Sequence, residues 1–185
     1  MKTPVDWDQS YKAGQYDGAG DRNQGIRYAL IAGVVREAGL KSLLDVGCGH
    51  GGLRDFLPDS VTKYTGLDIS SVALQGANFQ RDERTICANV EVWEPDDTYD
   101  CIVLSEVIYY CRDVEEVLHK LRGCLRPGGV MIVSVFHHRS RFSQNYRALK
   151  RTRRFLSSGE LVADFQIVSE MPSRHTWSTL ASQLG

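Results

Sequence analysis

Two alternating patterns of apolar residues run along the chain from Asn23 onward. Short, nearly continuous apolar runs are typical of strands buried in a parallel sheet, and apolar residues spaced three or four positions apart are typical of helices that cover one. The run 99–105 is the clearest strand, and 114–125 carries the clearest helical stripe. The predicted helices cover residues 23–38, 51–57, 71–78 and 114–125, and the predicted strands cover 42–46, 64–69, 85–90, 99–105, 130–136, 160–170 and 175–181.

Strands that alternate with helices predict a mostly parallel sheet with helices on both faces, and therefore an α/β fold. A turn around Pro172-Ser173, rather than a helix, joins the last two strands, so the last strand is expected to enter the sheet antiparallel. No repeat or linker divides the chain, which predicts a single domain. Its expected parts are an N-terminal segment 1–22, a core 23–136, and a basic segment with a terminal hairpin over 137–185.

Three glycines at alternate positions follow the first predicted strand, in the run Asp45-Val-Gly-Cys-Gly-His-Gly51. The second predicted strand ends in an acid, Asp68. In a βαβ unit, such a loop lets backbone amides face a nucleotide-like cofactor while the carboxylate accepts hydrogen bonds from ribose hydroxyls. The alternatives are a plain tight turn for the glycines and a helix-capping role for Asp68.

Composition narrows the class of protein. The chain has 185 residues, 42% apolar and 24% charged, which suits one soluble domain with a sizeable core. The net charge of −1 argues against attraction of the whole surface to nucleic acid or anionic membranes. No apolar stretch is long enough to span a bilayer, and the N-terminus lacks the apolar core of a secretion signal, so a cytoplasmic location is expected.

The five cysteines include no Cys-x-x-Cys pair, so neither a metal site nor a disulfide framework is expected. Cys87 and Cys101 fall in strand-like runs and are expected to pack as small core residues.

Four motifs, in order along the chain, resemble those of the class I methyltransferases that use S-adenosylmethionine. They are the glycine run 45–51, the second-strand acid in 64–70, the fourth-strand run 99–110, and Leu125-Arg-Pro-Gly-Gly before the fifth strand. The resemblance covers about residues 22–181. The stretch from Ala88 to Tyr110 is most similar to the small nodulation protein S-like group, which N-methylates an amino sugar. The resemblance implies a Rossmann-like, seven-stranded, mostly parallel sheet with its last strand antiparallel, and S-adenosylmethionine as the cofactor.

The resemblance also implies the cofactor contacts. Asp45 is expected to organise the glycine loop or to reach the ammonium of the cofactor through water. Asn89 stands where many relatives have an Asp, and its amide oxygen can accept the same hydrogen bond from adenine; a turn role is the alternative. The expected cofactor-binding residues are Asp45, Gly47, Cys48, Gly49, Gly51, Asp68, Ile69, Asn89, Val90, Ser105 and Glu106.

Acceptor chemistry is expected from side chains beyond the fourth and fifth strands, because ligands of open α/β sheets bind at the carboxyl ends of strands. His137, Glu106 and Tyr110 are the expected catalytic residues, since a His or Glu there can remove a proton from an amine or hydroxyl. An amine that binds in its neutral form needs no dedicated base. The alternatives are a structural Glu106, a solvated pair of His137 and His138, and core packing of Tyr109 and Tyr110.

Aromatic residues also precede the first predicted core helix: Trp7, Tyr11 and Tyr16. They are expected to fold over the cofactor as a lid, to belong to a frayed terminus, or to belong to a helix docked elsewhere.

The segment 137–154 contains seven Lys or Arg and no acid. It is either a solvated helix face that balances an acidic body or a dock for an anionic group: a phosphate, a carboxylate, an acidic carrier protein or RNA.

The predicted function is S-adenosylmethionine-dependent N- or O-methylation of a small metabolite, such as an amino sugar or a natural-product intermediate, by an in-line displacement driven by positioning. The expected partner is a small-molecule acceptor, for which the basic segment suits an anionic group, with neither a membrane nor nucleic acid involved. The oligomeric state is left open between monomer and homodimer.

Two alternatives remain. One is methylation of RNA or protein recruited by residues 139–154, although Ser105-Glu-Val-Ile replaces the Asn/Asp-Pro-Pro-Tyr run that holds exocyclic base amines. The other is a fold that binds the cofactor or a partner without turnover.

Overall fold

The computed structural model describes residues 2–16, 22–77, 79, 83–137, 140–157, 159–168 and 176–183, and only the backbone of residues 22, 23, 137, 160–168 and 176–183. The helices are α1 (Pro4–Lys12), α2 (Arg22–Glu37), α3 (Ser71–Gly76), α4 (Val114–Arg122) and α5 (Gln144–Leu156), with short 3-10 helices η1 (Arg54–Phe56) and η2 (Ile108–Tyr110). The strands are β1 (Ser42–Val46), β2 (Lys63–Asp68), β3 (Arg84–Cys87), β4 (Tyr99–Ser105), β5 (Leu125–His137), β6 (Glu160–Val168) and β7 (Thr176–Gln183).

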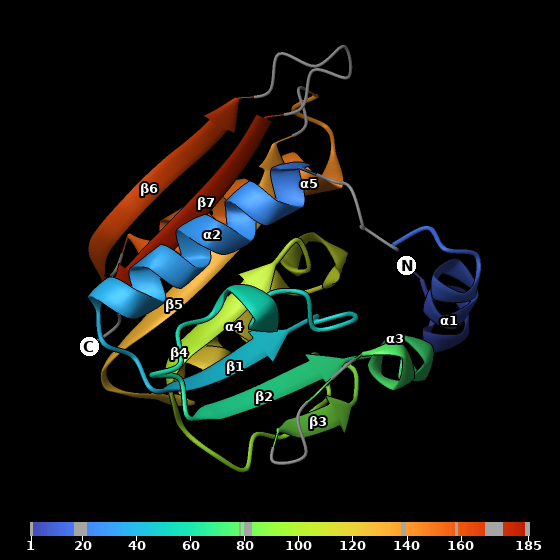
Figure 1. The fold of residues 1–185 in the computed structure, drawn as a ribbon. Coiled ribbons are helices and arrows are strands. Elements are labelled where there is room, and N and C mark those ends of the chain that lie inside the picture. The colour runs from blue at the N-terminus through green and yellow to red at the C-terminus, as the bar shows by residue number, and fades with distance from the viewer. Residues whose placement is uncertain are drawn as a thin grey trace.

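Within these residues the strands form one sheet in the order β3-β2-β1-β4-β5-β7-β6 (Figure 1). The first five strands of the chain are parallel, and β7 pairs antiparallel with both β5 and β6. The strand order reverses between the neighbours β1 and β4, and ligands of open α/β sheets bind beyond the carboxyl ends of strands at such a point. The predicted α/β fold with a parallel sheet is confirmed.

Side-chain alternation along the strands builds two core layers. In β4, Ile102 and Leu104 face the layer that α4 and α5 cover, whereas Cys101 and Val103 face the layer that α2 covers. Figure 1 shows α2 lying across one face of the sheet. Both faces are therefore covered, which explains why the central strands read as continuous apolar runs.

Local chemistry sets the ends of the covering helices. After α2, Gly39 adopts a φ of +64°, and the Leu40 N–H reaches back to the Val35 carbonyl, as in a Schellman motif. At the start of α4, the Asp113 side chain accepts a hydrogen bond from the Glu116 N–H at 3.0 Å.

The expected helix over 51–57 is wrong. Turns follow the glycine loop, and only the 3-10 helix η1 forms. Gly51 has a φ of +75°, outside the helical region, and Leu57 before Pro58 is extended with a ψ of 145°. The space between these residues is too short for a stable α-helix.

Further boundaries differ. The helix expected over 114–125 ends at Arg122, before Gly123. The third strand ends at Cys87 rather than at 90, because a turn anchored on the Asn89 carbonyl follows. The expected turn at 125–129 is instead part of β5. The pairing of β5 with β4 is irregular there, because the register shifts between Tyr99 and Cys101 of β4. The third helix stops at Gly76 rather than at 78.

The expectation for Cys87 is also wrong: its side chain is exposed, because β3 is an edge strand with little cover. Cys101 is buried, as expected. No described helix is long and apolar enough to cross a membrane.

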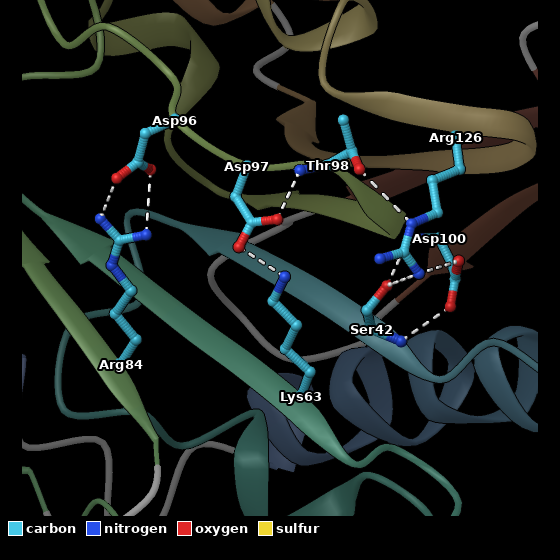
Figure 2. A network of polar contacts seen from close by, with 8 residues as sticks. All are labelled: Ser42, Lys63, Arg84, Asp96, Asp97, Thr98, Asp100 and Arg126. Atoms are coloured by element: carbon cyan, nitrogen blue, oxygen red, sulfur yellow. Dashed lines mark hydrogen bonds and ion pairs between the residues drawn. The ribbon is translucent and has the colours of Figure 1, made fainter.

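A polar network ties the amino ends of the five parallel strands together (Figure 2). At its centre, the Asp100 carboxylate accepts the backbone N–H groups of Lys41 and Ser42 at 3.0 and 2.9 Å and pairs with Arg126 at 3.1 Å. Burial raises the pKa of Asp100, but these bonds outweigh it and hold the pKa below its usual value. Lys63–Asp97 and Arg84–Asp96 pairs continue the network toward β3. This edge lies opposite the carboxyl ends of the strands.

Candidate functional site

A cavity of about 1030 Å³ opens at the carboxyl ends of β1, β2 and β4. Its size is at the upper end of the range for small-molecule sites, about 300–1,000 Å³. The glycine loop, the second-strand acid, the turn after β3 and the segment after β4 meet there. The predicted residues that line it are Gly47, Cys48, Gly49, Asp68, Ile69, Asn89, Val90, Ser105, Glu106, Tyr109 and Tyr110.

Two of the predicted cofactor residues, Asp45 and Gly51, are not among the described residues that line the cavity. Asp45 is buried behind the loop, where its carboxylate accepts the Tyr64 hydroxyl at 2.7 Å. Burial raises the pKa of Asp45 to about 7, against the lowering effect of the Tyr64 hydrogen bond. Asp45 therefore links β1 to the Tyr64 side chain of β2, and the organising role expected of it stays a prediction.

The glycine loop is packed tightly from both sides. Gly47 has a φ of +71°, and a Cβ there would lie 2.6 Å from the Val107 side chain. Gly49 has a φ of +55°, and a Cβ there would lie 2.9 Å from the Tyr11 hydroxyl. The backbone conformation and the close neighbours both require glycine at these positions.

Asp68 sits at the end of β2 and holds the loop in place. One carboxylate oxygen accepts the Gly49 N–H at 2.9 Å, and the other accepts the Ser70 N–H at 2.8 Å. Burial raises the pKa of Asp68, and the backbone hydrogen bonds offset part of that rise. The carboxylate lies on the cavity wall, which suits the predicted ribose contact. The helix-capping alternative is wrong, because Ser70 caps α3 and its hydroxyl accepts the Ala73 N–H at 3.2 Å.

Asn89 takes the turn role and also lines the cavity. Its side-chain oxygen accepts the Glu91 N–H at 2.9 Å, which is the turn role, and Asn89 lines the cavity beside Val90. The adenine contact stays a prediction.

Glu106 is bound from several directions. Its carboxylate accepts hydrogen bonds from the Ser134 hydroxyl, from the Phe136 N–H at 2.8 Å and from the Tyr109 hydroxyl at 3.2 Å. Burial raises the pKa of Glu106, and the nearby Arg27 charge lowers it. Its φ of +61° is a conformation that non-glycine residues rarely adopt outside constrained sites. This geometry favours the structural alternative, in which Glu106 orders the wall formed by the tyrosines.

The N-terminal helix α1 covers part of the cavity. Trp7, Tyr11 and Tyr16 all line it, and the Tyr11 ring meets the His50 ring of the glycine loop at 5.0 Å. Asp8 fixes the helix, because its carboxylate accepts the Ser70 hydroxyl at 2.6 Å.

Further bonds to the start of α3 complete this anchor: the Ser71 hydroxyl and the Val72 N–H also donate to Asp8, each at 3.2 Å. Figure 1 shows α1 beside α3. These contacts are consistent with the predicted lid rather than with a frayed terminus.

Sequence reasoning missed Arg27, which is only 5% exposed and lines the cavity. Its Nε donates to the Ser105 hydroxyl at 3.0 Å. Arg27 precedes Ile31 and Val35 at intervals of four on the buried face of α2. A cation on an apolar helical stripe was the signal that could have revealed it. Asp8 and Lys2 were missed as well, and nothing in their local pattern marks them.

The side chains of the predicted histidines are not described. The His137 side chain and all of His138 lie outside the described residues. The described part of the basic segment forms α5, whose Ala148, Leu149 and Thr152 are buried. Its charged positions 147, 150, 151, 153 and 154 are exposed. The Gln144 side chain bonds to the Tyr109 carbonyl, which places the start of α5 beside the cavity wall. The described residues contain no cluster of three or more His, Cys, Asp or Glu that could hold a metal ion.

Comparisons with known proteins agree with this geometry. A family model described as "Methyltransferase domain" matches residues 23–185. An uncharacterized methyltransferase of Mycobacterium tuberculosis (strain ATCC 25618 / H37Rv) is 28% identical over 118 residues, which are 62% of this chain and 60% of that protein. A ubiquinone biosynthesis O-methyltransferase of Bradyrhizobium sp. (strain ORS 278) is 28% identical over 100 residues, which are 51% of this chain and 40% of that protein. The chain thus spans 60% or less of the length of these relatives.

Among solved structures, the N-methyltransferase NodS from Bradyrhizobium japonicum WM9, in complex with S-adenosyl-L-homocysteine, superposes with a TM-score of 0.71. The match covers 90% of this chain and 89% of NodS at 15% sequence identity, so it shows a shared fold. The family match shows more than the fold: the chain belongs to the methyltransferase domain family, which confirms the predicted methyltransferase class and S-adenosylmethionine as the cofactor of that class.

Proposed function

We propose that this chain transfers the methyl group of S-adenosylmethionine to a nitrogen or oxygen of a small molecule. The observation that carries the proposal is the single cavity wall on which the glycine loop, Asp68 and the tyrosines after β4 meet. The volume of about 1030 Å³ leaves room for an acceptor beside a nucleoside cofactor. The small-molecule acceptor is further supported by the names of similar proteins, which include a ubiquinone biosynthesis O-methyltransferase.

The residues that line the cavity fit this cofactor. Gly47 and Gly49 line the cavity without a side chain, and the buried Asp68 carboxylate can accept hydrogen bonds from paired hydroxyls. Val46, Leu67, Ile69 and Val90 supply apolar surface for a flat base, beside Asn89. We also propose the full seven-stranded arrangement with an antiparallel last strand, which the pairing of β5 with β7 supports.

When bound, S-adenosylmethionine supplies a methyl group activated by its sulfonium, so the protein has to align rather than activate it. We propose that Asp68 and the glycine loop fix the donor end. Glu106 orients Tyr109, and Tyr109 with Tyr110 shapes the acceptor space. The α1 helix, as the lid of a single domain, excludes water from the site. Proton removal by His137 stays a prediction.

Calorimetry and a transfer assay test this function. The full chain is titrated with S-adenosylmethionine, and radiolabelled methyl transfer is then measured on a panel of small amines, phenols and hydroxy compounds. We expect saturable one-to-one binding and transfer to at least one acceptor class. A folded protein that gives no binding heat refutes the function, and binding without transfer to any acceptor supports the turnover-free alternative.

A second candidate is methylation of RNA or protein. The observation that favours it is the exposed basic face of α5, whose start lies against the Tyr109 segment. Replacing Arg151, Arg153 and Arg154 by Gln distinguishes the two functions. Unchanged transfer to a small acceptor supports the first, whereas transfer found only with a macromolecule and lost in the triple variant supports the second.

A further inference from the structure

An aromatic wall lines part of the cavity. It consists of Trp7 and Tyr16 from the N-terminal segment and Tyr110 from η2, all of which line the cavity. The Trp7 and Tyr110 rings meet edge to face with centroids 4.8 Å apart, and the Trp7 and Tyr16 centroids are 5.6 Å apart. Three ring faces and edges thus converge on one part of the site.

The wall already holds a cation of the chain itself. The Lys2 Nζ lies 4.5 Å from the centroid of Trp7 and 5.5 Å from that of Tyr16, within the range of cation–π attraction. The same ammonium donates to the Ser10 hydroxyl at 2.9 Å and to the Tyr16 hydroxyl at 3.3 Å. Lys2 is exposed, and its long stem can swing into water, so it can vacate the rings.

The aromatic wall continues from Tyr110 to Tyr109. The Tyr109 and Tyr110 ring centroids are 4.5 Å apart with the rings tilted by 53°, and the Tyr109 hydroxyl donates to Glu106. Burial raises the pKa of Tyr110, so its phenol stays neutral while its ring remains electron-rich. From Lys2 to Tyr109, ring faces and hydroxyl oxygens therefore favour a positively charged ligand. The Glu106 carboxylate is left out of this argument, because three donors and the nearby Arg27 charge already offset it.

We propose that this aromatic wall binds an alkylammonium group carried by the methyl acceptor, and that the Lys2 ammonium is an internal occupant that the acceptor displaces. The assignment to the acceptor rests on the proposed function; the affinity for ammonium does not. The sulfonium of the cofactor is another cation that such rings attract, so the experiment separates the two sources.

The probe is choline, compared with 3,3-dimethyl-1-butanol, a neutral molecule of the same shape. Binding is measured by calorimetry and by tryptophan emission, with the full chain saturated with S-adenosylhomocysteine, which has no positive sulfur. We expect choline to bind and the neutral isostere to bind at least severalfold more weakly.

Three variants test the internal occupant. Lys2→Ala should tighten choline binding about two- to fivefold, because the competing ammonium is gone. Lys12→Ala, which removes the same charge at the end of α1 and is not among the described residues that line the cavity, should leave choline affinity unchanged. Trp7→Leu should weaken choline binding about two- to fivefold or more.

Equal binding of choline and its neutral isostere overturns the proposal, as does a Lys2→Ala variant that behaves like Lys12→Ala. If Trp7→Leu weakens binding of S-adenosylmethionine but not of S-adenosylhomocysteine, the wall serves the sulfonium and the acceptor assignment is wrong. If the wild type binds choline selectively but neither form of the cofactor, the proposed function fails while the ammonium site stands.

Discussion

Replacing Gly47 by Ala is expected to disrupt the glycine loop both by backbone strain and by steric overlap. Gly47 has a φ of +71°, and the added Cβ would lie 2.6 Å from Cγ2 and 2.8 Å from Cβ of Val107. The second contact is the more serious, because a Cβ atom moves only with its backbone. Gly39 offers a matched control: its φ is +64°, but a Cβ there meets nothing within 4 Å.

The two positions separate the two costs. A left-handed conformation costs an alanine about 1–2 kcal/mol, and this cost applies to both variants. Overlap that forces neighbours to shift adds about 1–3 kcal/mol, and it applies to Gly47→Ala alone. The free energy of unfolding should therefore fall by about 2–5 kcal/mol in Gly47→Ala and by about 1–2 kcal/mol in Gly39→Ala. A displaced loop should also bind the cofactor poorly, whereas Gly39→Ala should bind it normally.

Urea unfolding followed by circular dichroism measures the first quantity, and calorimetry with S-adenosylmethionine measures the second. With an m-value of about 2 kcal/mol/M, the midpoints of the two variants should differ by about 0.5–1.5 M. Gly33→Ala, in the interior of α2 with nothing within 4 Å, should be stabilised by about 0.5–1 kcal/mol and shows that the assay detects both signs. The reasoning is refuted if Gly47→Ala unfolds at the same midpoint as Gly39→Ala and binds the cofactor equally well.

Three further outcomes are expected. Asp68→Asn should weaken S-adenosylmethionine binding about ten- to hundredfold by calorimetry, through loss of charge-assisted hydrogen bonds, while Asp113→Asn at the α4 cap should not; equal affinities would contradict the ribose role. Asp8→Asn should free α1 and speed tryptic cleavage at Lys12 severalfold, and an unchanged digest would show that the Ser70 contact does not anchor the helix. Because burial raises the pKa of Asp45 to about 7, the folded protein binds a proton there that the unfolded chain releases near pH 4. As the pH rises from about 4 to 7, the free energy of unfolding should therefore fall by up to about 1.4 kcal/mol per pH unit. Asp45→Asn should remove this part of the slope, and a variant whose pH profile runs parallel to that of the wild type would count against this role of Asp45.

The sequence pattern predicted most of the fold because the central strands are buried on both faces. The β4 strand has the predicted bounds, since an unbroken apolar run has few other uses in a soluble domain. The pattern failed where backbone conformation decides: left-handed Gly51 and the extended residue before Pro58 prevent the helix expected after the loop. It also failed for Cys87, because an apolar run does not reveal whether a strand lies at a sheet edge.

The residues of the candidate site also fall into a group that the sequence predicted and a group that it did not. The glycine loop and Asp68 were predictable because a chemical motif fixes their spacing. Contacts between distant segments were not: Asp8 meets Ser70 across 62 positions, and Arg27 meets Ser105 across 78. For Glu106, a polar residue after β4 was expected to act on substrate. Two of its three hydrogen-bond donors, Ser134 and Phe136, come from the distant strand β5, and together with Tyr109 they favour a structural role.

The central claim is that the cavity at the carboxyl ends of β1, β2 and β4 is the cofactor site, and that Asp68, the glycine loop and the aromatic wall all line it. A crystal structure of the full chain with S-adenosylhomocysteine tests it most directly. The account predicts the ribose hydroxyls within hydrogen-bonding distance of the Asp68 carboxylate, with the sulfur facing the space in front of Tyr109 and Tyr110. A ligand bound elsewhere, or one whose ribose does not contact Asp68, would contradict the account.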